Sequence, residues 1–354
     1  MNYCHGGDVL TYREQYGRDP LDFSANINPL GMPQPVQEAV RRSASRCAPY
    51  PDPCCRTLTA ALAEKEGLPP SQVLVGNGAA DLIFRLAYAL RPRRALLLCP
   101  GFAEYEAALR AAGCQCSFFP LREEEGFRLG EDFLPLLEDP GEVVFLCNPN
   151  NPTGECIPRR LLEQILEKCQ RAGALLVVDE CFRSFLDEPD QYTMKPFLQG
   201  NPGLLLLGAF TKLYAMAGLR LGWCFCSDRA LLDKMEAAAQ PWSVSTPAME
   251  AGLAALKEDA FVRRSRALVS AERERLRAGL AAAGMKVYGS RANYLFFRSP
   301  LPALGERMKR RGVLLRDCSN YRGLGPGFYR AAVRLPEENS RLLAALAACL
   351  AEEE

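Results

Sequence analysis

Short runs of apolar residues recur through the middle of this chain. They occupy residues 95–99, 143–147, 174–178, 204–207 and 222–226. Runs of this length predict strands that are buried on both faces of a sheet. Amphipathic stretches lie between them, such as 104–112 and 158–172, and the second begins at a proline and stops at Gly173, which is the usual punctuation of a helix.

Strands therefore alternate with helices, and this order predicts an α/β fold with a mostly parallel sheet. In such a fold, functional residues lie on loops at the carboxyl ends of the strands. A helical pattern over 247–283 leads to further runs at 294–298, 313–316 and 329–333, which predict a smaller α+β domain. We expect an N-terminal arm over 1–40 that joins the small domain, a large domain over 41–260, and a small domain over 261–354.

Composition and charge exclude several classes of protein. The 354 residues carry 43 Lys and Arg against 42 Asp and Glu, so no net charge attracts nucleic acid or an anionic membrane. No apolar run reaches the roughly 20 residues that span a bilayer. The 15 cysteines are scattered and there is one histidine, a pattern that predicts no metal site. We expect reduced thiols and a cytoplasmic protein.

Two loops follow predicted strands and could bind a ligand. Gly76-Asn77-Gly78-Ala79-Ala80 opens a helical pattern, and backbone N–H groups at a helix start can bind phosphate. The same sequence is also typical of an ordinary tight turn. Residues 148–154, with two Asn-Pro steps, form an extended loop that is either a simple connection or a rigid holder for an Asn side chain.

Two charged residues stand where apolar runs end. Asp179 follows 175–178, and a buried carboxylate there needs a partner, either within the fold or on a protonated heterocycle. Lys212 follows 204–207 within Phe210-Thr211-Lys212. A lysine among apolar neighbours can form Schiff bases, although most lysines are solvated surface charges.

These motifs in this order resemble one known family. Asn-Pro-Thr-Gly at 151–154, Asp179-Glu180, Thr211-Lys212 and Gly-Leu-Arg-Leu-Gly at 218–222 are similar to the signature of fold type I enzymes dependent on pyridoxal 5'-phosphate, the aspartate aminotransferase superfamily. The similarity extends from the N-terminal arm to the last helix. It implies a large domain with a mostly parallel central sheet and a smaller α+β domain.

The resemblance implies a role for each matching residue. Lys212 would carry the cofactor through a Schiff base, and Asp179 would keep its pyridine nitrogen protonated. Phe102 would stack on the ring, while Asn151 would bind the ring's 3'-oxygen. Tyr50 would reach the phosphate in a partner subunit, which implies a homodimer with shared active sites. The cofactor phosphate would be bound by Gly78, Ala79, Ala80 and Arg220.

Within the superfamily, two groups look closest, and both act on phosphorylated amines: the histidinol-phosphate aminotransferases and the threonine-phosphate decarboxylases of cobalamin biosynthesis. His5-Gly6-Gly7, the segment 22–31 and the segment 316–320 resemble the decarboxylases. The aminotransferase pattern has Tyr where this chain has Phe182. A phenylalanine cannot form a hydrogen bond with the cofactor's 3'-oxygen, so that contact is left to Asn151.

The resemblance also locates the substrate, a phosphorylated amino acid. Arg316 and Arg330 would bind its anionic groups, and which arginine takes the carboxylate stays open. The resemblance adds His5, Gly6, Asn26 and Asn151 to the substrate site. It implies decarboxylation of O-phospho-L-threonine to (R)-1-amino-2-propanol phosphate, with serine phosphate as an alternative substrate. The cofactor weakens the bond perpendicular to its ring, so the clamp on the carboxylate selects the reaction.

Two other functions remain open from the sequence. An aminotransferase acting on histidinol phosphate would keep every cofactor residue. A regulatory protein of the same fold would usually carry a DNA-binding domain, for which this chain has neither length nor charge. Ala209, Ala79 and Ala80 supply no hydroxyl where the family often has one, and a lost hydrogen bond to a charged group costs about 1.5 to 3 kcal/mol.

Overall fold

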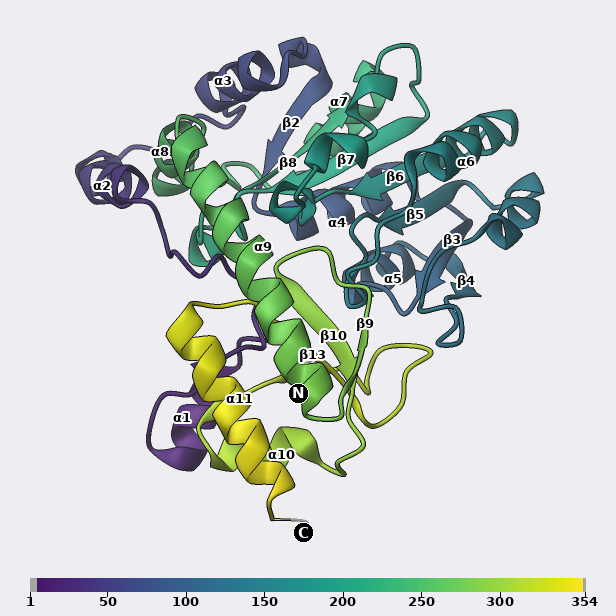
Figure 1. Ribbon diagram of the computed structural model, residues 1–354. Coiled ribbons are helices and arrows are strands. Elements are labelled where there is room, and N and C mark those ends of the chain that lie inside the picture. The colour runs from purple at the N-terminus through teal and green to yellow at the C-terminus, as the bar shows by residue number, and fades with distance from the viewer. Residues whose placement is uncertain (1–4, 353–354) are drawn as a thin grey trace.

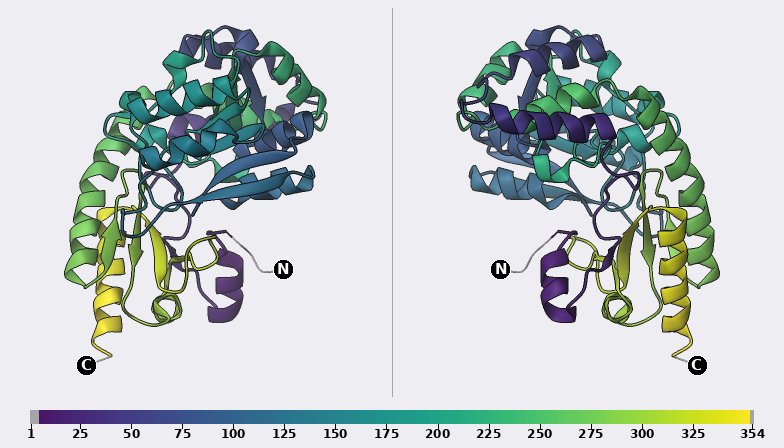
Figure 2. Two further views of the ribbon diagram at one scale, coloured as in Figure 1. Left: turned by 90° about the vertical axis from the view of Figure 1, so that its right-hand side faces the viewer. Right: turned by 90° about the vertical axis from the view of Figure 1, so that its left-hand side faces the viewer.

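The computed structural model describes residues 5–352 and divides them into a larger and a smaller layered part (Figures 1 and 2). The larger part is built on a seven-stranded sheet in which β8 alone runs in the opposite direction to the other six strands. The mostly parallel sheet predicted from the sequence is therefore confirmed. In spatial order its strands are β2 (Val73–Gly76), β8 (Gly222–Cys226), β7 (Leu204–Ala209), β6 (Leu175–Asp179), β5 (Val143–Cys147), β3 (Arg94–Cys99) and β4 (Gln115–Pro120).

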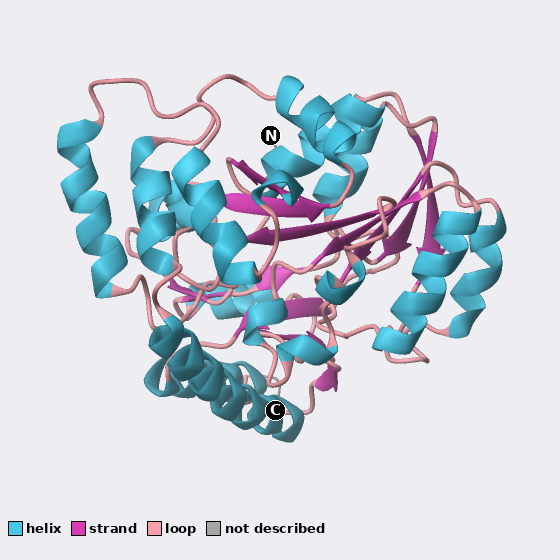
Figure 3. Cartoon of the chain, turned by 90° about the horizontal axis from the view of Figure 1, so that it is seen from above, coloured by secondary structure: helices cyan, strands magenta, loops and turns pink. Residues whose placement is uncertain are grey.

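Both faces of this sheet are buried, because successive side chains of a strand point to opposite sides. On β3, Leu96 and Leu98 pack into one core with residues of α6 (Arg159–Arg171), whereas Leu97 packs into a second core with residues of α4 (Ala79–Leu90). Figure 3 shows helices on both sides of the sheet. The apolar runs of the sequence follow from this double burial.

The other helices of the larger part surround the sheet. They are α2 (Gln34–Ser43), α3 (Arg56–Glu66), α5 (Ala103–Ala111), α7 (Arg229–Ala237) and α8 (Thr246–Ala255). Short 3-10 helices are η1 (Ala44–Arg46), η2 (Pro70–Gln72), η3 (Glu131–Glu138), η4 (Arg183–Phe185), η5 (Pro189–Gln191), η6 (Lys195–Phe197) and η7 (Ala217–Leu219). No helix within residues 5–352 is long and apolar enough to cross a membrane.

The smaller part contains a four-stranded antiparallel sheet covered by helices. Its strands, in spatial order, are β12 (Arg316–Asp317), β13 (Phe328–Ala332), β10 (Tyr294–Arg298) and β9 (Lys286–Tyr288). Its helices are α9 (Asp259–Ala282), α10 (Leu304–Arg310) and α11 (Pro336–Leu350). Phe23 from the N-terminal arm shares their core with Leu276 and Leu342.

The N-terminal arm lies against the smaller part (Figure 2). After α1 (Val9–Tyr16), strand β1 (Leu21–Asp22) pairs with β11 (Val313–Leu314). Helix α2 instead packs against α8 of the larger part. Residues 40 and 260, at which we expect domain boundaries, lie within α2 and α9. The division into 1–40, 41–260 and 261–354 therefore stays a prediction. Residues 1–4 and 353–354 of these ranges lie outside the described residues.

Two predicted elements are divided in the structure. The pattern over 247–283 forms two helices, α8 and α9, because a turn at 256–258 separates them. The run over 313–316 forms two strands, because β11 pairs with the arm and β12 pairs with β13. Leu315 connects these two sheets and is buried, so its hydrophobicity is satisfied without strand pairing.

Candidate active site

A cavity of about 760 Å³ lies where the carboxyl ends of the large sheet meet the smaller part and the N-terminal arm. Most of the predicted site residues line it, although they are dispersed over the sequence. They are His5, Gly6, Asn26, Ala79, Ala80, Phe102, Asn151, Asp179, Lys212, Arg220, Arg316 and Arg330. Gly78 and Tyr50 do not line it. A shared cavity is what residues with roles in one reaction require.

Asp179, the last residue of β6, is held by two hydrogen bonds. The hydroxyl of Tyr105 donates to Asp179 Oδ2 at 2.6 Å, and the backbone N–H of Cys181 donates to Oδ1 at 2.9 Å. Burial and the neighbouring Asp179 carboxylate raise the pKa of Tyr105 well above its ordinary value, so its hydroxyl keeps its proton. The carboxylate is thus fixed in orientation at the edge of the cavity.

Lys212 follows β7 and is enclosed by protein except where it faces the cavity. Burial lowers its pKa to about 8, and the positive charges of Arg330 and Arg220 act in the same direction. A lysine with this pKa is partly neutral near pH 8, and the neutral amine is the nucleophilic form. The position therefore suits an amine that attacks a carbonyl carbon.

The loop before α4 brings backbone N–H groups to the cavity beside Arg220. Gly78 has a positive φ of 86°, and a side chain there would place its Cβ 2.8 Å from Arg220 Nη2. Only glycine therefore permits this approach of the guanidinium. Ala79 and Ala80 follow at the first turn of α4, where unpaired N–H groups and the helix dipole favour an anion.

Asn151 connects the cofactor residues with Arg330. The guanidinium of Arg330 donates to Asn151 Oδ1, and the hydroxyl of Tyr321 lies 3.4 Å from the same oxygen. Arg330 also donates to the backbone oxygen of Ser24 at 2.9 Å. One buried arginine thereby contacts the arm and the loop after β5.

The other predicted substrate residues approach from the arm and the smaller part. Arg316 donates to Asn320 Oδ1 at 2.9 Å and lies over the ring of Tyr321. His5 Nε2 lies 2.7 Å from Glu104 Oε1. Both amide atoms of Asn26 are buried with no protein partner in the described residues, and a buried amide without partners is suited to a ligand.

Tyr50 is placed differently from the other predicted residues. Its side chain stacks on Trp242, with ring centroids 4.4 Å apart, and it is 78% exposed. A tyrosine so exposed is accessible to another subunit. Its contact with a partner's phosphate remains a prediction.

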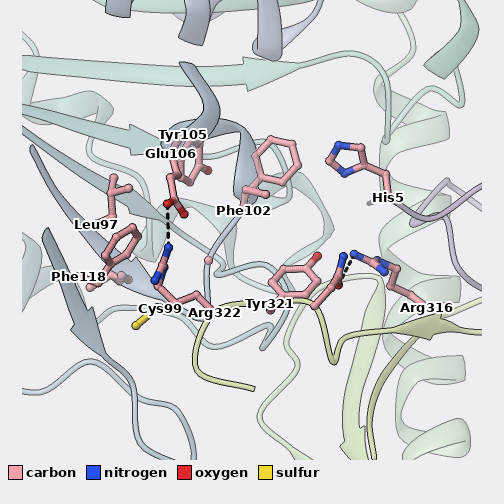
Figure 4. Close-up of a pocket in the computed structure, with 14 residues that line it drawn as sticks. His5, Leu97, Cys99, Phe102, Tyr105, Glu106, Phe118, Arg316, Tyr321 and Arg322 are labelled. Atoms are coloured by element: carbon pink, nitrogen blue, oxygen red, sulfur yellow. Dashed lines mark hydrogen bonds and ion pairs between the residues drawn. The ribbon is translucent and has the colours of Figure 1, made fainter. Parts of the chain in front are cut away.

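Three residues of the site were not predicted: Glu104, Tyr105 and Tyr321. Glu104 and Tyr105 lie in the first turn of α5, whose N-cap is Phe102, and their helical spacing was the only signal that they gave. Figure 4 shows Phe102, Tyr321 and His5 around a smaller pocket of about 290 Å³ that adjoins the cavity, with Glu106 bonded to Arg322 at its side. Within the described residues, no group of His, Cys, Asp and Glu side chains could hold a metal.

Comparison with known proteins establishes the family. Residues 18–346 match the model of aminotransferase class I and II. The chain belongs to this family. A family relative, the threonine-phosphate decarboxylase of Salmonella typhimurium, is 39% identical over 98% of this chain and 96% of that protein. The histidinol-phosphate aminotransferase of Symbiobacterium thermophilum is 33% identical over 99% of this chain and 96% of that protein.

Solved structures of the family share the fold. The L-threonine-O-3-phosphate decarboxylase of Porphyromonas gingivalis superimposes with a TM-score of 0.82 at 25% identity, over 93% of this chain and 99% of that one. Pyridoxal 5'-phosphate, which the sequence resemblance implies, is the cofactor of this chain. The site fits this cofactor, because it offers a lysine of lowered pKa, a fixed carboxylate and an anion-binding helix start beside Arg220.

Proposed function

We propose that this protein decarboxylates O-phospho-L-threonine to (R)-1-amino-2-propanol phosphate in cobalamin biosynthesis, with pyridoxal 5'-phosphate as cofactor. The observation that carries the proposal is the division of one cavity into two sides. Its cofactor side consists of Asn151, Asp179 and Lys212. Its substrate side is basic and consists of His5, Gly6, Asn26, Arg316 and Arg330. A substrate with both a carboxylate and a phosphate suits these basic groups.

On the cofactor side, the residues set the electronic properties of the reaction. The bound cofactor withdraws electrons from the bonds at the substrate α-carbon. Asp179, oriented by Tyr105, would keep the proton on the pyridine nitrogen. Lys212 would hold the cofactor and later move a proton at the α-carbon, for which its pKa of about 8 is well matched. Phe102 would lie against the ring, and Gly78, Ala79, Ala80 and Arg220 would bind the phosphate.

On the substrate side, we assign the carboxylate to Arg330 and the phosphate to Arg316 and His5. Arg330 contacts Asn151 and therefore lies nearest the cofactor side, where the reacting carbon must sit. Arg316 lies over Tyr321 and bonds to Asn320 rather than to Asn151, so we assign it to the other end of the substrate. The arm carries His5 across the opening, and its closure would exclude water from the reaction.

We also infer a cytoplasmic homodimer. The exposed Tyr50 beside Trp242 supports a contact with a second copy, because exposed aromatic pairs are typical of interfaces. The thiols of the described cysteines are free, which supports a reducing compartment.

Product analysis tests the proposed reaction. The cofactor-loaded enzyme is incubated with O-phospho-L-threonine without any keto acid, and carbon dioxide and the amine are measured. We expect one aminopropanol phosphate for each carbon dioxide. Absence of gas, with transamination of histidinol phosphate by a keto acid, would identify an aminotransferase instead. O-phospho-L-serine in a parallel reaction measures how far the missing methyl group matters, which in apolar pockets is about 10- to 200-fold.

A further inference from the structure

Glu104 is an acidic residue inside a cavity that we expect to bind anions. It lies in the first turn of α5, two residues after Phe102, and its Oε1 is 2.7 Å from His5 Nε2. The His5 ring also lies beside Phe102, with centroids 6.1 Å apart. Figure 4 shows His5 beside Phe102 and above Arg316.

The carboxylates that line the cavity differ in their partners. Asp179 is bonded to Tyr105 and Cys181. Asp22 accepts from the backbone N–H and the hydroxyl of Ser24. Glu104 instead bonds to His5 on the N-terminal arm, 99 residues away in sequence. The hydrogen bond from His5 lowers the pKa of Glu104, so its side chain is an anion at neutral pH.

The arm that carries His5 is anchored at its other side. The backbone N–H of Gly7 donates to Ser24 Oγ at 2.7 Å, and a Cβ on Gly6 would lie only 2.1 Å from the backbone oxygen of Ser24. The same oxygen accepts from Arg330. His5 thus leaves a segment fixed beside Arg330 and reaches across the opening to the larger part, where Glu104 holds it.

We propose that Glu104 is a positioning residue for the substrate's phosphate: its carboxylate orients the His5 imidazole beside Phe102 and keeps the arm closed over the bound anion. The inference rests on the proposed function for the identity of the substrate. The positioning role of Glu104 requires only that the ligand carries a phosphate. Glu104 then acts through His5 and has no contact with the anion of its own.

The direction in which phosphate affinity changes when Glu104 is replaced distinguishes this role from simple charge repulsion. A carboxylate near a phosphate repels it, so its removal alone would tighten anion binding. If Glu104 positions His5, its removal weakens anion binding although a repulsive charge is lost. Glu104→Gln keeps the size of the side chain and removes the charge that strengthens its hydrogen bond with His5, which makes it the most informative substitution.

Steady-state kinetics with the cofactor-loaded enzyme provides the test. For Glu104→Gln we expect the KM for O-phospho-L-threonine and the Ki of inorganic phosphate to rise together, each about tenfold, which corresponds to about 1.4 kcal/mol. We expect kcat to change less than about twofold, because the residue acts on binding. An unchanged or lower Ki for phosphate would overturn the proposal.

A double-mutant cycle identifies His5 as the intermediary. His5→Ala should raise KM and Ki at least as much as Glu104→Gln, and in the His5→Ala background Glu104→Gln should bring no further rise. A full additional rise in the double variant would show that Glu104 acts by another route, which contradicts the inference. The matched control is Glu106→Gln on the same helix, because Glu106 pairs with Arg322 and Arg110 rather than with the arm; its Ki for phosphate should stay unchanged.

Two further measurements keep this test separate from the proposed function. Calorimetry with inorganic phosphate on the cofactor-loaded wild type and Glu104→Gln gives the same comparison even if the wild type releases no carbon dioxide. Amide hydrogen exchange at residues 6–8 should become faster in Glu104→Gln if the arm opens. Equal exchange in both proteins, with equal phosphate affinity, would refute the positioning role.

Discussion

The cofactor side and the substrate side of the cavity are built in different ways. Asp179 ends strand β6 and Lys212 follows strand β7, and the two strands lie next to each other in a sheet buried on both faces. His5 and Arg330 come from the arm and from β13, hundreds of residues apart. Arg330 bonds to the carbonyl of Ser24 and to the amide of Asn151, and the arm near His5 bonds to Ser24 through Gly7. The first side is fixed by the core, whereas the second depends on how separate segments are held together.

This difference explains how one family can host two reactions. Relatives named as decarboxylase and as aminotransferase match this chain over nearly its whole length. A rigid cofactor side can be retained while the segments around the substrate change, because loops and arms tolerate change better than a core. Variants on the two sides should therefore differ in kind: cofactor-side variants in cofactor state or kcat, and substrate-side variants in KM.

The largest expected effect is that of Lys212→Ala. Loss of this amine should lower kcat by about 10³-fold or more, since it removes both the attachment point and a proton carrier. The measurement is carbon dioxide release together with the absorbance of the covalently bound cofactor, which should disappear. Lys257→Ala, at an exposed position, should leave both unchanged. Retention of the bound chromophore in Lys212→Ala would disprove the assignment.

Arg330→Lys should have the next largest effect and tests the link between the sides. Lysine keeps the charge but cannot donate to Asn151 and Ser24 in the same fork geometry. At about 1.5 to 3 kcal/mol for a charged hydrogen bond, KM should rise about 10- to 100-fold. Arg298→Lys is the control, because Arg298 pairs with Glu123 and neither residue lines the cavity. A fall in kcat with unchanged KM would place Arg330 on the cofactor side instead.

Gly6→Ala examines the substrate side alone. The added methyl group would meet the backbone oxygen of Ser24 at 2.1 Å, so the arm must move away. We expect a rise in KM of about tenfold, equal to about 1.4 kcal/mol, with the cofactor spectrum unchanged. Gly325→Ala, where a Cβ meets nothing within 4 Å, should behave as wild type. An unaffected KM in Gly6→Ala would mean that the arm does not close on the substrate.

The smallest effect concerns pH and sharpens the description of the cofactor side. Because the pKa of Lys212 is lowered to about 8, the reactive neutral amine increases as the pH rises through 8. The rate at which added cofactor attaches to the cofactor-free enzyme should therefore increase about fivefold from pH 7 to pH 8 and level off above about pH 9. Stopped-flow absorbance gives this rate. A rate still rising at pH 10 would indicate a lysine of ordinary pKa.

The cofactor side could be predicted from the sequence because its residues follow apolar runs. Asp179 and Lys212 both stand at the end of such a run, and the order of the motifs gave the family. Glu104 and Tyr105 could not be predicted, since a polar residue in a first helical turn is common and their partners His5 and Asp179 are 99 and 74 residues away. The break at 256–258 was also missed, because no Gly or Pro marks it.

The pairing of β1 with β11 has a consequence for how the chain folds during its synthesis. Leu21 pairs with Val313, so the arm cannot reach its place until nearly the whole chain has been made. At about 5 to 20 residues per second, the roughly 290 residues between them take about 15 to 60 seconds to synthesise. The larger sheet, whose strands end at residue 226, can assemble during that delay. The substrate side is thus the last part of the active site to form, and an unfinished chain has no closed cavity.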